Sequence, residues 1–285
     1  MSITPSLGDE STVAIPAGSI AYRERGEGPG VVFVHGVGVN GDLWRKVVPP
    51  LAERYRCIAP DLPLGSHSLP MREDADLSLA GLARIVADFL EALDLREVTI
   101  VANDTGGAIA QWLVGHHPER IGRLVLTSCD AFEKFPPTPQ RYLTLASRSR
   151  AAMWLVSRAV QLRPIQRSPL AYGWVTHRPI EPAITRSFTE PVARDEGIRR
   201  DLTRLLRAVD TRYTYEAADA LRAFERPSLV LWAADDKLFP HDHGRQLAER
   251  LAAGSYEEIA DSRTFIPEDQ PERLAERLAA FLSAD

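Results

Sequence analysis

The sequence predicts an α/β fold in which a mostly parallel sheet of about eight strands carries helices on both faces and an inserted helical cap. Two observations predict it. Short continuous apolar runs, typical of strands buried on both faces, alternate with helical patterns along most of the chain. The alternation breaks between about residues 131 and 225, where only helical periodicity is found. We therefore expect a core formed by residues 1–130 and 226–285 and a cap formed by residues 131–225.

The elements of the core follow in order along the chain. Residues 11–25 alternate between apolar and polar side chains around Pro16-Ala-Gly-Ser19, which predicts a β-hairpin. Six further runs predict strands, the last of them weaker, at residues 31–34, 57–60, 98–102, 124–127, 229–232 and 256–259. Helical patterns between and after them lie at about residues 41–54, 79–93, 106–117, 241–252 and 270–282. This strand–helix alternation is typical of parallel strands joined by crossovers.

The predicted cap shows helical periodicity at about residues 140–161, 193–209 and 212–223, with breaks expected at the prolines in positions 164, 169, 179, 182 and 191. Residues 138–224 contain 15 Arg, no Lys and eight Asp or Glu, although the whole chain has a net charge of −5. This positive charge has two interpretations. The cap attracts an anionic substrate, or its arginines lie on solvated helix faces and are attracted to the acidic core.

Composition and charge exclude several classes of protein. Hydrophobic residues make up 45 % and charged residues 26 % of the 285 residues, as in ordinary globular proteins. The negative net charge gives no reason to expect nucleic acid, and no apolar run approaches the roughly 20 residues that span a bilayer. The first ten residues do not resemble a secretory signal, and Cys57 and Cys129 are expected to be free thiols. We expect a cytoplasmic monomer or homodimer that acts on a small molecule and has no membrane partner.

Motifs for metal or phosphate binding are weak in this sequence. His241-Asp-His243 is a short pair without further ligands at suitable spacing. Gly26-Glu-Gly-Pro-Gly30 is better interpreted as a turn than as a phosphate loop, since it lacks the Walker pattern. We therefore expect no metal and no cofactor.

The most informative motif is Val101-Ala-Asn-Asp-Thr-Gly-Gly107, which joins a predicted strand to a predicted helix. A strand, a sharp turn between small residues and a helix are typical of a nucleophile elbow, and Asp104 stands at its tip. A carboxylate at this position can attack an alkyl carbon and form an alkyl-enzyme ester, whereas it is a poor nucleophile towards esters and amides. Alternatively, Asp104 only caps the following helix, since Asp is favoured at helix N-caps.

Further motifs occur in order around the elbow: His35-Gly36, Asp61-Leu-Pro, His117-Pro118-Glu-Arg, Trp232-Ala-Ala-Asp-Asp236 and Gln270-Pro271-Glu. With them, nearly the whole chain resembles the α/β-hydrolase superfamily, and more narrowly its members with an Asp nucleophile, the haloalkane and haloacid-type dehalogenases and the epoxide hydrolases. The resemblance implies hydrolysis of a carbon–halogen or epoxide bond. Neither sub-family pattern is complete, because Gly38 replaces the usual proline of epoxide hydrolases, and Val37 and Thr105 replace the Asn and Trp of many haloalkane dehalogenases.

The resemblance also implies the partners of the nucleophile. The backbone N–H groups of Val37 and Thr105 would form the oxyanion hole, which stabilises the tetrahedral intermediate when water opens the ester. The acid that orients the base would be Asp236, which follows the late strand, or Asp130, which ends an earlier one. Both also suit a loop-capping carboxylate, and of the two we favour Asp236.

The histidine that should act as the base is absent from its expected position. When the family motif is aligned with this sequence, Thr264 stands at the position of the histidine and Phe265 follows it. No histidine occurs after His243. A Thr hydroxyl has no useful basicity at neutral pH, so it cannot activate water as an imidazole does. A relocated base would account for this, with His67, His241 and His243 as candidates in loops at the carboxyl ends of strands.

Several alternatives do not need a histidine. The reaction can be an elimination, isomerisation or cyclisation in which Asp104 is a base with a pKa raised by an apolar pocket. The protein can also be a ligand-binding module without catalysis, or Thr264 can be an engineered exchange that traps the covalent intermediate. The nature of the base, and with it the reaction, stays open at this point.

Several aromatic residues are candidates for substrate binding. A proton for a leaving oxygen can come from the cap tyrosines Tyr142, Tyr172, Tyr213 and Tyr215. Trp154 and Trp174 can line the pocket or hold a halide, and Phe265 follows Thr264. His35 is a further candidate, although its motif favours a role in the turn. Aromatic residues at helical spacing are also typical of simple packing.

Overall fold

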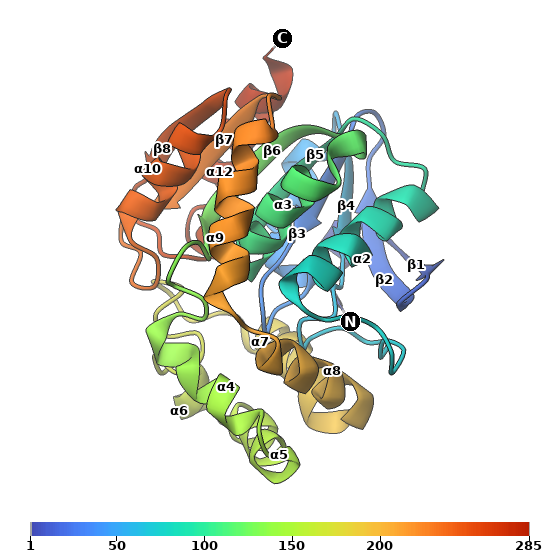
Figure 1. The fold of residues 1–285 in the computed structure, drawn as a ribbon, viewed down its shortest axis with the longest axis vertical. Helices are drawn as coiled ribbons and strands as arrows, with labels where there is room; N and C mark the ends of the chain where they lie inside the picture. Colours follow the sequence, from blue (N-terminus) through green and yellow to red (C-terminus); the bar gives the residue numbers. More distant parts are fainter. Residues whose placement is uncertain (1, 285) are drawn as a thin grey trace.

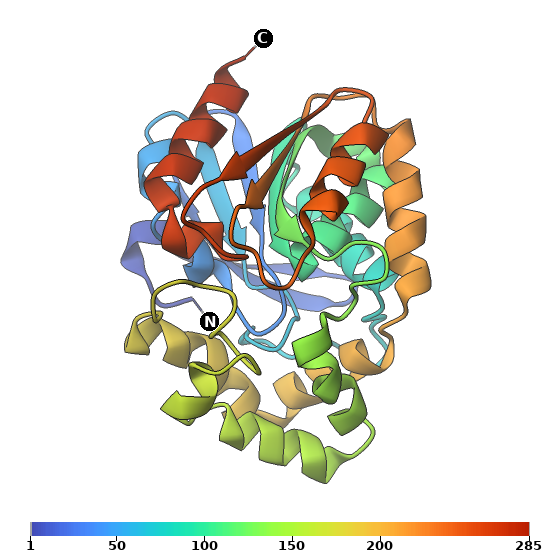
Figure 2. The same ribbon diagram turned by 90° about the vertical axis from the view of Figure 1, so that its left-hand side faces the viewer.

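The computed structural model describes residues 2–284 and shows one eight-stranded sheet with helices on both faces (Figures 1 and 2). The strands are β1 (Asp9–Ile15), β2 (Gly18–Arg25), β3 (Gly30–Val34), β4 (Arg56–Pro60), β5 (Val98–Asp104), β6 (Ile121–Cys129), β7 (Ser228–Ala233) and β8 (Gly254–Ile259). Their order across the sheet is β1-β2-β4-β3-β5-β6-β7-β8. The pairs β1–β2 and β2–β4 are antiparallel and the other neighbouring pairs are parallel. The predicted fold class is confirmed.

The helices cover both faces of this sheet. They are α1 (Val48–Leu51), α2 (Leu79–Ala92), α3 (Thr105–His116), α4 (Arg141–Ala146), α5 (Arg150–Ala159), α6 (Arg163–Gln166), α7 (Pro182–Arg194), α8 (Glu196–Arg207), α9 (Thr211–Ala220), α10 (His241–Arg250), α11 (Ile266–Asp269) and α12 (Pro271–Ser283). Figure 2 shows α12 on one side of the sheet and α9 on the other. The helix predicted at about 41–54 is only a 3₁₀ turn and the short α1, because two prolines in α1 cannot donate helical hydrogen bonds.

Burial explains why the strand signals differ in strength. All six residues of β7 are buried, as expected for a strand covered by helices on both faces, and its sequence is a continuous apolar run. β8 is an edge strand with mostly exposed or partly exposed residues, and its sequence signal is correspondingly weaker. The four strands β3, β5, β6 and β7 are neighbours, so their carboxyl ends meet at one edge of the sheet, where sites in open α/β sheets form.

The cap helices α4–α8 follow β6 and lie together beyond this edge (Figure 1). Helix α9 does not lie with them, although the expected boundary at residue 225 assigns it to the cap. It packs along α3 on the sheet, where a Cβ on Gly115 would overlap the Cβ of Ala220. The glycine permits this close helix–helix approach. The structure thus places α9 with the core.

Pro191 lies inside α7, whereas the sequence predicts a break there. A proline in a helix cannot donate to the carbonyl four residues earlier, which here belongs to Ser187. The side chain of Asn40 donates to that carbonyl instead, over 3.2 Å. The helix continues because a residue of the core satisfies the group that the proline leaves free.

Candidate active site

The elbow is formed by β5 and α3, which meet without an intervening loop at Asp104 and Thr105. Asp104 has φ 56° and ψ −132°, a conformation that costs residues other than glycine about 1–3 kcal/mol. A Cβ on Gly106 would overlap the carbonyl oxygen of Val34, and one on Gly107 would overlap the side chain of Cys129. The small residues of the motif therefore permit the turn that carries Asp104 at the carboxyl edge of the sheet.

The carboxylate of Asp104 lies against the turn after β3. A Cβ on Gly36 would overlap Oδ2 of Asp104, and the N–H of Thr105 donates to the same carboxylate. The side chain is partly buried and keeps some surface open to the cavity. Burial is the main cause that raises the pKa of Asp104 to about 7; the Thr105 N–H opposes this increase, and the negative charge of Asp236 contributes to it. The group thus changes its charge near neutral pH.

The contact with Gly36 can be tested by substitution. We expect Gly36→Ala to slow any reaction of Asp104 by about 100-fold, because the three atoms nearest to the new Cβ all belong to the Asp104 side chain, which must move. The rate of the reaction and the melting temperature should be measured on the same preparation. An unchanged rate in a folded variant would show that the position of the carboxylate against Gly36 does not matter for the chemistry.

Asp236 is held by three donors behind the elbow. Its Oδ1 accepts hydrogen bonds from the N–H groups of Leu238 (2.8 Å) and Phe239 (2.9 Å) and from Oγ1 of Thr264 (3.0 Å). Its Oδ2 is buried, and the hydroxyl of Ser128 contributes a further, weaker interaction with the carboxylate. Burial raises the pKa of Asp236, and these hydrogen bonds oppose the increase. The carboxylate is thus fixed mainly through one of its two oxygens.

Asp130 lies on the other side of the elbow, directly after β6. Its Oδ2 accepts from Oγ1 of Thr105 over 2.8 Å, and its backbone carbonyl accepts from the side chain of Gln111 over 3.0 Å. Burial raises the pKa of Asp130 well above its usual range, and the charge of Asp104 adds to the effect. The structure therefore brings both predicted acids, Asp236 and Asp130, close enough to Asp104 for their charges to interact.

Thr264 is buried beside Asp236 and is held by the chain around it. Its carbonyl accepts from Nδ2 of Asn103 over 2.8 Å, and the N–H of the next residue, Phe265, donates to the carbonyl of Val175 over 2.8 Å. The hydroxyl donates to Asp236 in the place where an imidazole N–H would be expected. Asn103 precedes the nucleophile position, and its role in holding this loop was not predicted from the sequence.

None of the histidines of the described chain lines the cavity at Asp104. Nε2 of His67 lies 3.3 Å from Oδ2 of Asp201 in α8. His67 lines a different surface pocket from the one at Asp104. His241 lies beside Glu258 and His243 beside Glu133. These positions give no support to a relocated imidazole base.

His35 serves the turn rather than a substrate. Its Nε2 accepts from the N–H of Leu62 over 2.9 Å, and its Nδ1 lies 2.9 Å from the carbonyl of Gly36. Burial lowers the pKa of His35 to about 4, so the ring is neutral. Both ring nitrogens are used inside the protein, and the expected contact of His35 with substrate is corrected.

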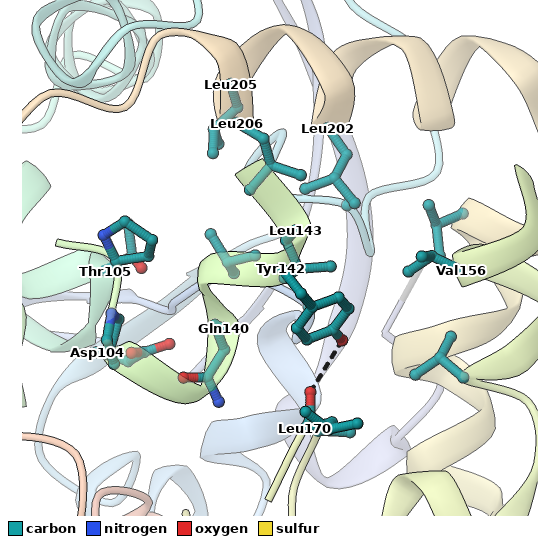
Figure 3. A pocket seen from close by; sticks show the side chains of 18 of the residues that line it. Asp104, Thr105, Gln140, Tyr142, Leu143, Val156, Leu170, Leu202, Leu205 and Leu206 are labelled. Carbon is teal, nitrogen blue, oxygen red and sulfur yellow. Dashed lines mark hydrogen bonds between the residues drawn. The ribbon is translucent and has the colours of Figure 1, made fainter. Parts of the chain in front are cut away.

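An apolar cavity runs from Asp104 into the cap. Figure 3 shows Asp104 and Thr105 on one wall and the leucines of α8 on another. Most lining residues are apolar and come from the cap: Phe135, Leu143, Met153, Val156, Val160, Leu170, Val175, Phe188, Val192, Leu202, Leu205, Leu206 and Val209. No arginine or lysine is among the described residues that line it. The sequence could not single out these residues, because apolar side chains at helical spacing look alike whether they fill a core or line a cavity.

The other predicted substrate residues are distributed between this cavity and the surface. Val37, Tyr142 and Phe265 line the cavity, and Tyr142 donates to the carbonyl of Leu170 over 3.0 Å (Figure 3). Trp154 is half exposed on the outer surface of the cap, and Trp174 packs against the core without lining the cavity. The expectation that these two tryptophans line the pocket is corrected.

Comparisons with known proteins find relatives that are named for different activities. A haloalkane dehalogenase of Mesorhizobium japonicum is 36 % identical over 133 residues, which are 46 % of this chain and 42 % of that protein. A cis-3-alkyl-4-alkyloxetan-2-one decarboxylase of Xanthomonas campestris is 26 % identical over 288 residues, covering 94 % of this chain and 93 % of that protein.

Solved structures and a family model extend this likeness to the whole fold. The structure of the epoxide hydrolase CorEH has a TM-score of 0.79 at 18 % identity and covers 96 % of this chain and 98 % of that one, a likeness of fold alone. The family model described as alpha/beta hydrolase fold matches residues 29–271, which include the elbow, the cap and the Asp236 loop. The chain therefore belongs to the α/β hydrolase fold family.

Proposed function

We propose that this protein is an enzyme in which the carboxylate of Asp104 attacks an electrophilic carbon of a small neutral organic substrate. A carbon–halogen or epoxide carbon fits this chemistry, because a carboxylate displaces a halide or opens a strained ring more readily than it attacks an ester. The observation that carries the proposal is the position of Asp104 on a sharp elbow at the end of an apolar cavity without cationic lining residues among those described. The cavity favours a neutral substrate over the anionic one that the charge of the cap suggests.

The first step needs only groups that surround Asp104. A carboxylate oxygen forms a C–O bond to the substrate, and the halide or epoxide oxygen leaves with the electron pair of the broken bond. Of the cap tyrosines, Tyr142 and Tyr172 line the cavity and are the candidates that can protonate an epoxide oxygen. The N–H groups of Thr105 and Val37 are the candidate donors for the oxyanion that forms when the ester is opened.

The second step needs a base, and we propose that Asp236 supplies it. Formation of the ester removes the negative charge of Asp104, which otherwise opposes the ionisation of a neighbouring carboxyl. Oδ2 of Asp236 is buried and does not line the cavity, so this proposal requires that a water molecule enter the space between Asp236 and the ester. A carboxylate is a weaker base than imidazole, and the ester should therefore open slowly.

A second candidate function is proton transfer, with Asp104 as a base in an isomerisation or elimination. Two observations favour it: the pKa of Asp104 is raised to about 7, and no histidine of residues 2–284 lines the cavity. A carboxyl with a pKa near the working pH is suited to taking up and returning a proton. No step of such a reaction requires water to be activated.

One experiment separates these functions. The protein is incubated with a panel of haloalkanes and epoxides, and its intact mass is recorded together with the release of halide or diol. A mass increase that maps to Asp104 and decays with product release supports the proposed hydrolysis. Product release without an adduct, both in the wild type and in Asp236→Asn, supports proton transfer. In that case the next test is whether the protein exchanges the α-hydrogens of carbonyl substrates. Neither adduct nor product with any substrate would contradict both functions and favour a binding module.

The reaction should depend on pH through Asp104. Because only the carboxylate attacks or accepts a proton, the rate should fall about tenfold per pH unit below a pKa of about 7 and stay constant above it. Adduct formation under single-turnover conditions between about pH 5 and pH 9 measures this profile. A rate that is flat down to about pH 5 would show that Asp104 has an ordinary carboxyl pKa or that it is not the reacting group.

A further inference from the structure

The outer surface of cap helices α4–α6 carries an unusual set of exposed apolar side chains. Seven large hydrophobic residues of the described chain are strongly exposed, and five of them lie between positions 145 and 170. They are Leu145 (66 % exposed), Trp154 (49 %), Leu155 (62 %), Leu162 (57 %) and Leu170 (49 %). We call residues 141–170 the cap surface. Clustered exposed apolar residues mark sites of interaction, whereas single ones do not.

Helix α5 and the turn that follows it are apolar on two sides. Met153, Val156 and Val160 line the cavity on the inner side. Leu155 and Leu162 are exposed on the outer side, and helical turns of the backbone continue as far as Leu162. The cavity explains the inner residues, whereas the outer leucines are not covered by any part of residues 2–284.

Positive charge accompanies these apolar side chains. Residues 134–180 contain Lys134 and seven arginines but no Asp or Glu. No carboxylate of the described chain forms an ion pair with the arginines at positions 141, 148, 158, 163 and 167. In α7 and α8, by contrast, Arg194 pairs with Glu190 and Arg200 with Asp201. Within the cap surface Arg150 pairs with Glu196 of α8, so the charge of the other five arginines is left for a partner outside the described residues.

The cavity reaches this same surface. Tyr142, Leu143 and Leu170 belong to the cap surface and also line the cavity that ends at Asp104. Leu170 is half exposed as well, so it lies where the cavity meets solvent. Figure 1 shows α4, α5 and α6 at the end of the molecule opposite the C-terminus, away from the sheet. A flat partner can approach this end without touching the core.

We propose that the cap surface binds the surface of an anionic lipid bilayer. Exposed leucine and tryptophan side chains enter the boundary between headgroups and acyl chains, and arginines attract the lipid phosphates. The guanidinium carbon of Arg158 lies 5.6 Å from the centroid of the Trp154 ring, so a cationic and an apolar group stand side by side there. No helix in the described part of the chain could span a bilayer. The proposal of binding at the membrane surface replaces the expectation, made from the sequence, that the protein has no membrane partner. An apolar substrate dissolved in the bilayer would enter the cavity near Leu170.

Sedimentation with vesicles tests this binding, and it does not depend on the reaction at Asp104. The full chain is mixed with vesicles of phosphatidylcholine alone or with added phosphatidylglycerol. We expect partitioning onto the anionic vesicles that weakens with salt, and a loss of about tenfold or more in Leu155→Gln/Leu162→Gln. The matched control is Ile3→Gln/Tyr215→Gln, which removes two apolar residues of similar exposure (49 % and 47 %) elsewhere and should bind as wild type does.

The contribution of charge is tested with a second matched pair. Each arginine near an anionic membrane contributes about fivefold to partitioning, so Arg163→Gln/Arg167→Gln should lose about 25-fold. Arg96→Gln/Arg273→Gln changes the net charge equally on the core and should lose much less. Equal losses in both pairs, or leucine variants that bind as wild type does, would overturn the proposal.

Self-association is the main alternative to membrane binding for the cap surface. Sedimentation velocity on the wild type and on Leu155→Gln/Leu162→Gln, with circular dichroism to confirm folding, measures it. The proposal would be overturned in favour of an interface between two copies if the wild type is a dimer, the substitution dissociates it, and the wild type does not bind anionic vesicles at low salt. Absence of vesicle binding in a folded monomer would overturn it too.

Discussion

Replacing Asp104 with Asn is expected to abolish both the covalent adduct and turnover, with a loss of at least about 1,000-fold. The amide is neither a nucleophile nor a base at neutral pH, yet it has nearly the size of the carboxyl group. Asn also tolerates the positive φ of 56° better than most residues, so the elbow should persist. The measurement is intact mass and product release with the best substrate of the panel. Residual activity within tenfold of wild type would exclude Asp104 as the reacting group.

The same substitution should change stability with a defined dependence on pH. The pKa of Asp104 is about 7 in the folded protein against 3.8 for the ordinary group, so between these values the folded state holds a proton that the unfolded state has released. The free energy of unfolding of the wild type therefore falls as pH rises from about 4 to about 7 and is constant above. Asp104→Asn lacks this penalty and should be more stable by about 2–4 kcal/mol at about pH 8.

Chemical denaturation at several pH values checks this difference in stability. The difference between Asp104→Asn and the wild type should shrink towards acid pH and vanish near about pH 4, where the native carboxyl is protonated. Glu53→Gln is a suitable control, since that carboxylate is exposed at the surface of the core. A difference that is the same at all pH values would mean that Asn changes packing or backbone strain rather than an ionisation.

Replacing Thr264 with His is expected to accelerate the opening of an ester on Asp104 by about 100-fold or more. Oγ1 of Thr264 donates to Asp236, so an imidazole at this position can donate to the same carboxylate and use its other nitrogen to activate water. Thr264 is fully buried, and the larger ring should cost about 1–3 kcal/mol of stability. The rate at which the adduct mass disappears after removal of excess substrate measures the gain.

Two variants make this result specific. Thr264→Gln introduces a longer polar side chain without a useful base and should not accelerate the step. Thr264→His/Asp236→Asn should lose most of the gain, because the ring then lacks the carboxylate that orients it and stabilises its charge. An adduct that is as long-lived in folded Thr264→His as in the wild type would contradict the proposed geometry between Asp236, Thr264 and Asp104.

Much of the fold was predictable because its signals are local. The buried parallel strands are continuous apolar runs, and the elbow combines a strand end, small residues and a helix start within seven positions, Val101 to Gly107. Both acids, Asp130 and Asp236, closely follow strands whose carboxyl ends meet in the sheet. Knowing the order of strands is enough to bring these groups to one edge.

Other features depend on contacts between residues far apart in the chain. A proline in the sequence predicts the end of a helix, yet α7 continues through Pro191 because Asn40 satisfies the carbonyl of Ser187. His35 looks like a candidate ligand of substrate until Leu62 and Gly36 are seen to occupy both ring nitrogens. The partnerships with Asn40 and Leu62 cannot be inferred from the neighbouring sequence, since tertiary packing brings these residues together.

The sequence alone was enough to predict the fold class and the carboxylate at the elbow and to show that no histidine lies near position 264, because these features follow from residue identity and from periodicity along the chain. The tertiary structure was needed to show that Asp104 lines an apolar cavity, that no described histidine lines it, and that residues 141–170 expose five large apolar side chains. Burial, pKa and exposure depend on which distant segments pack together, and that packing is not encoded in any local pattern.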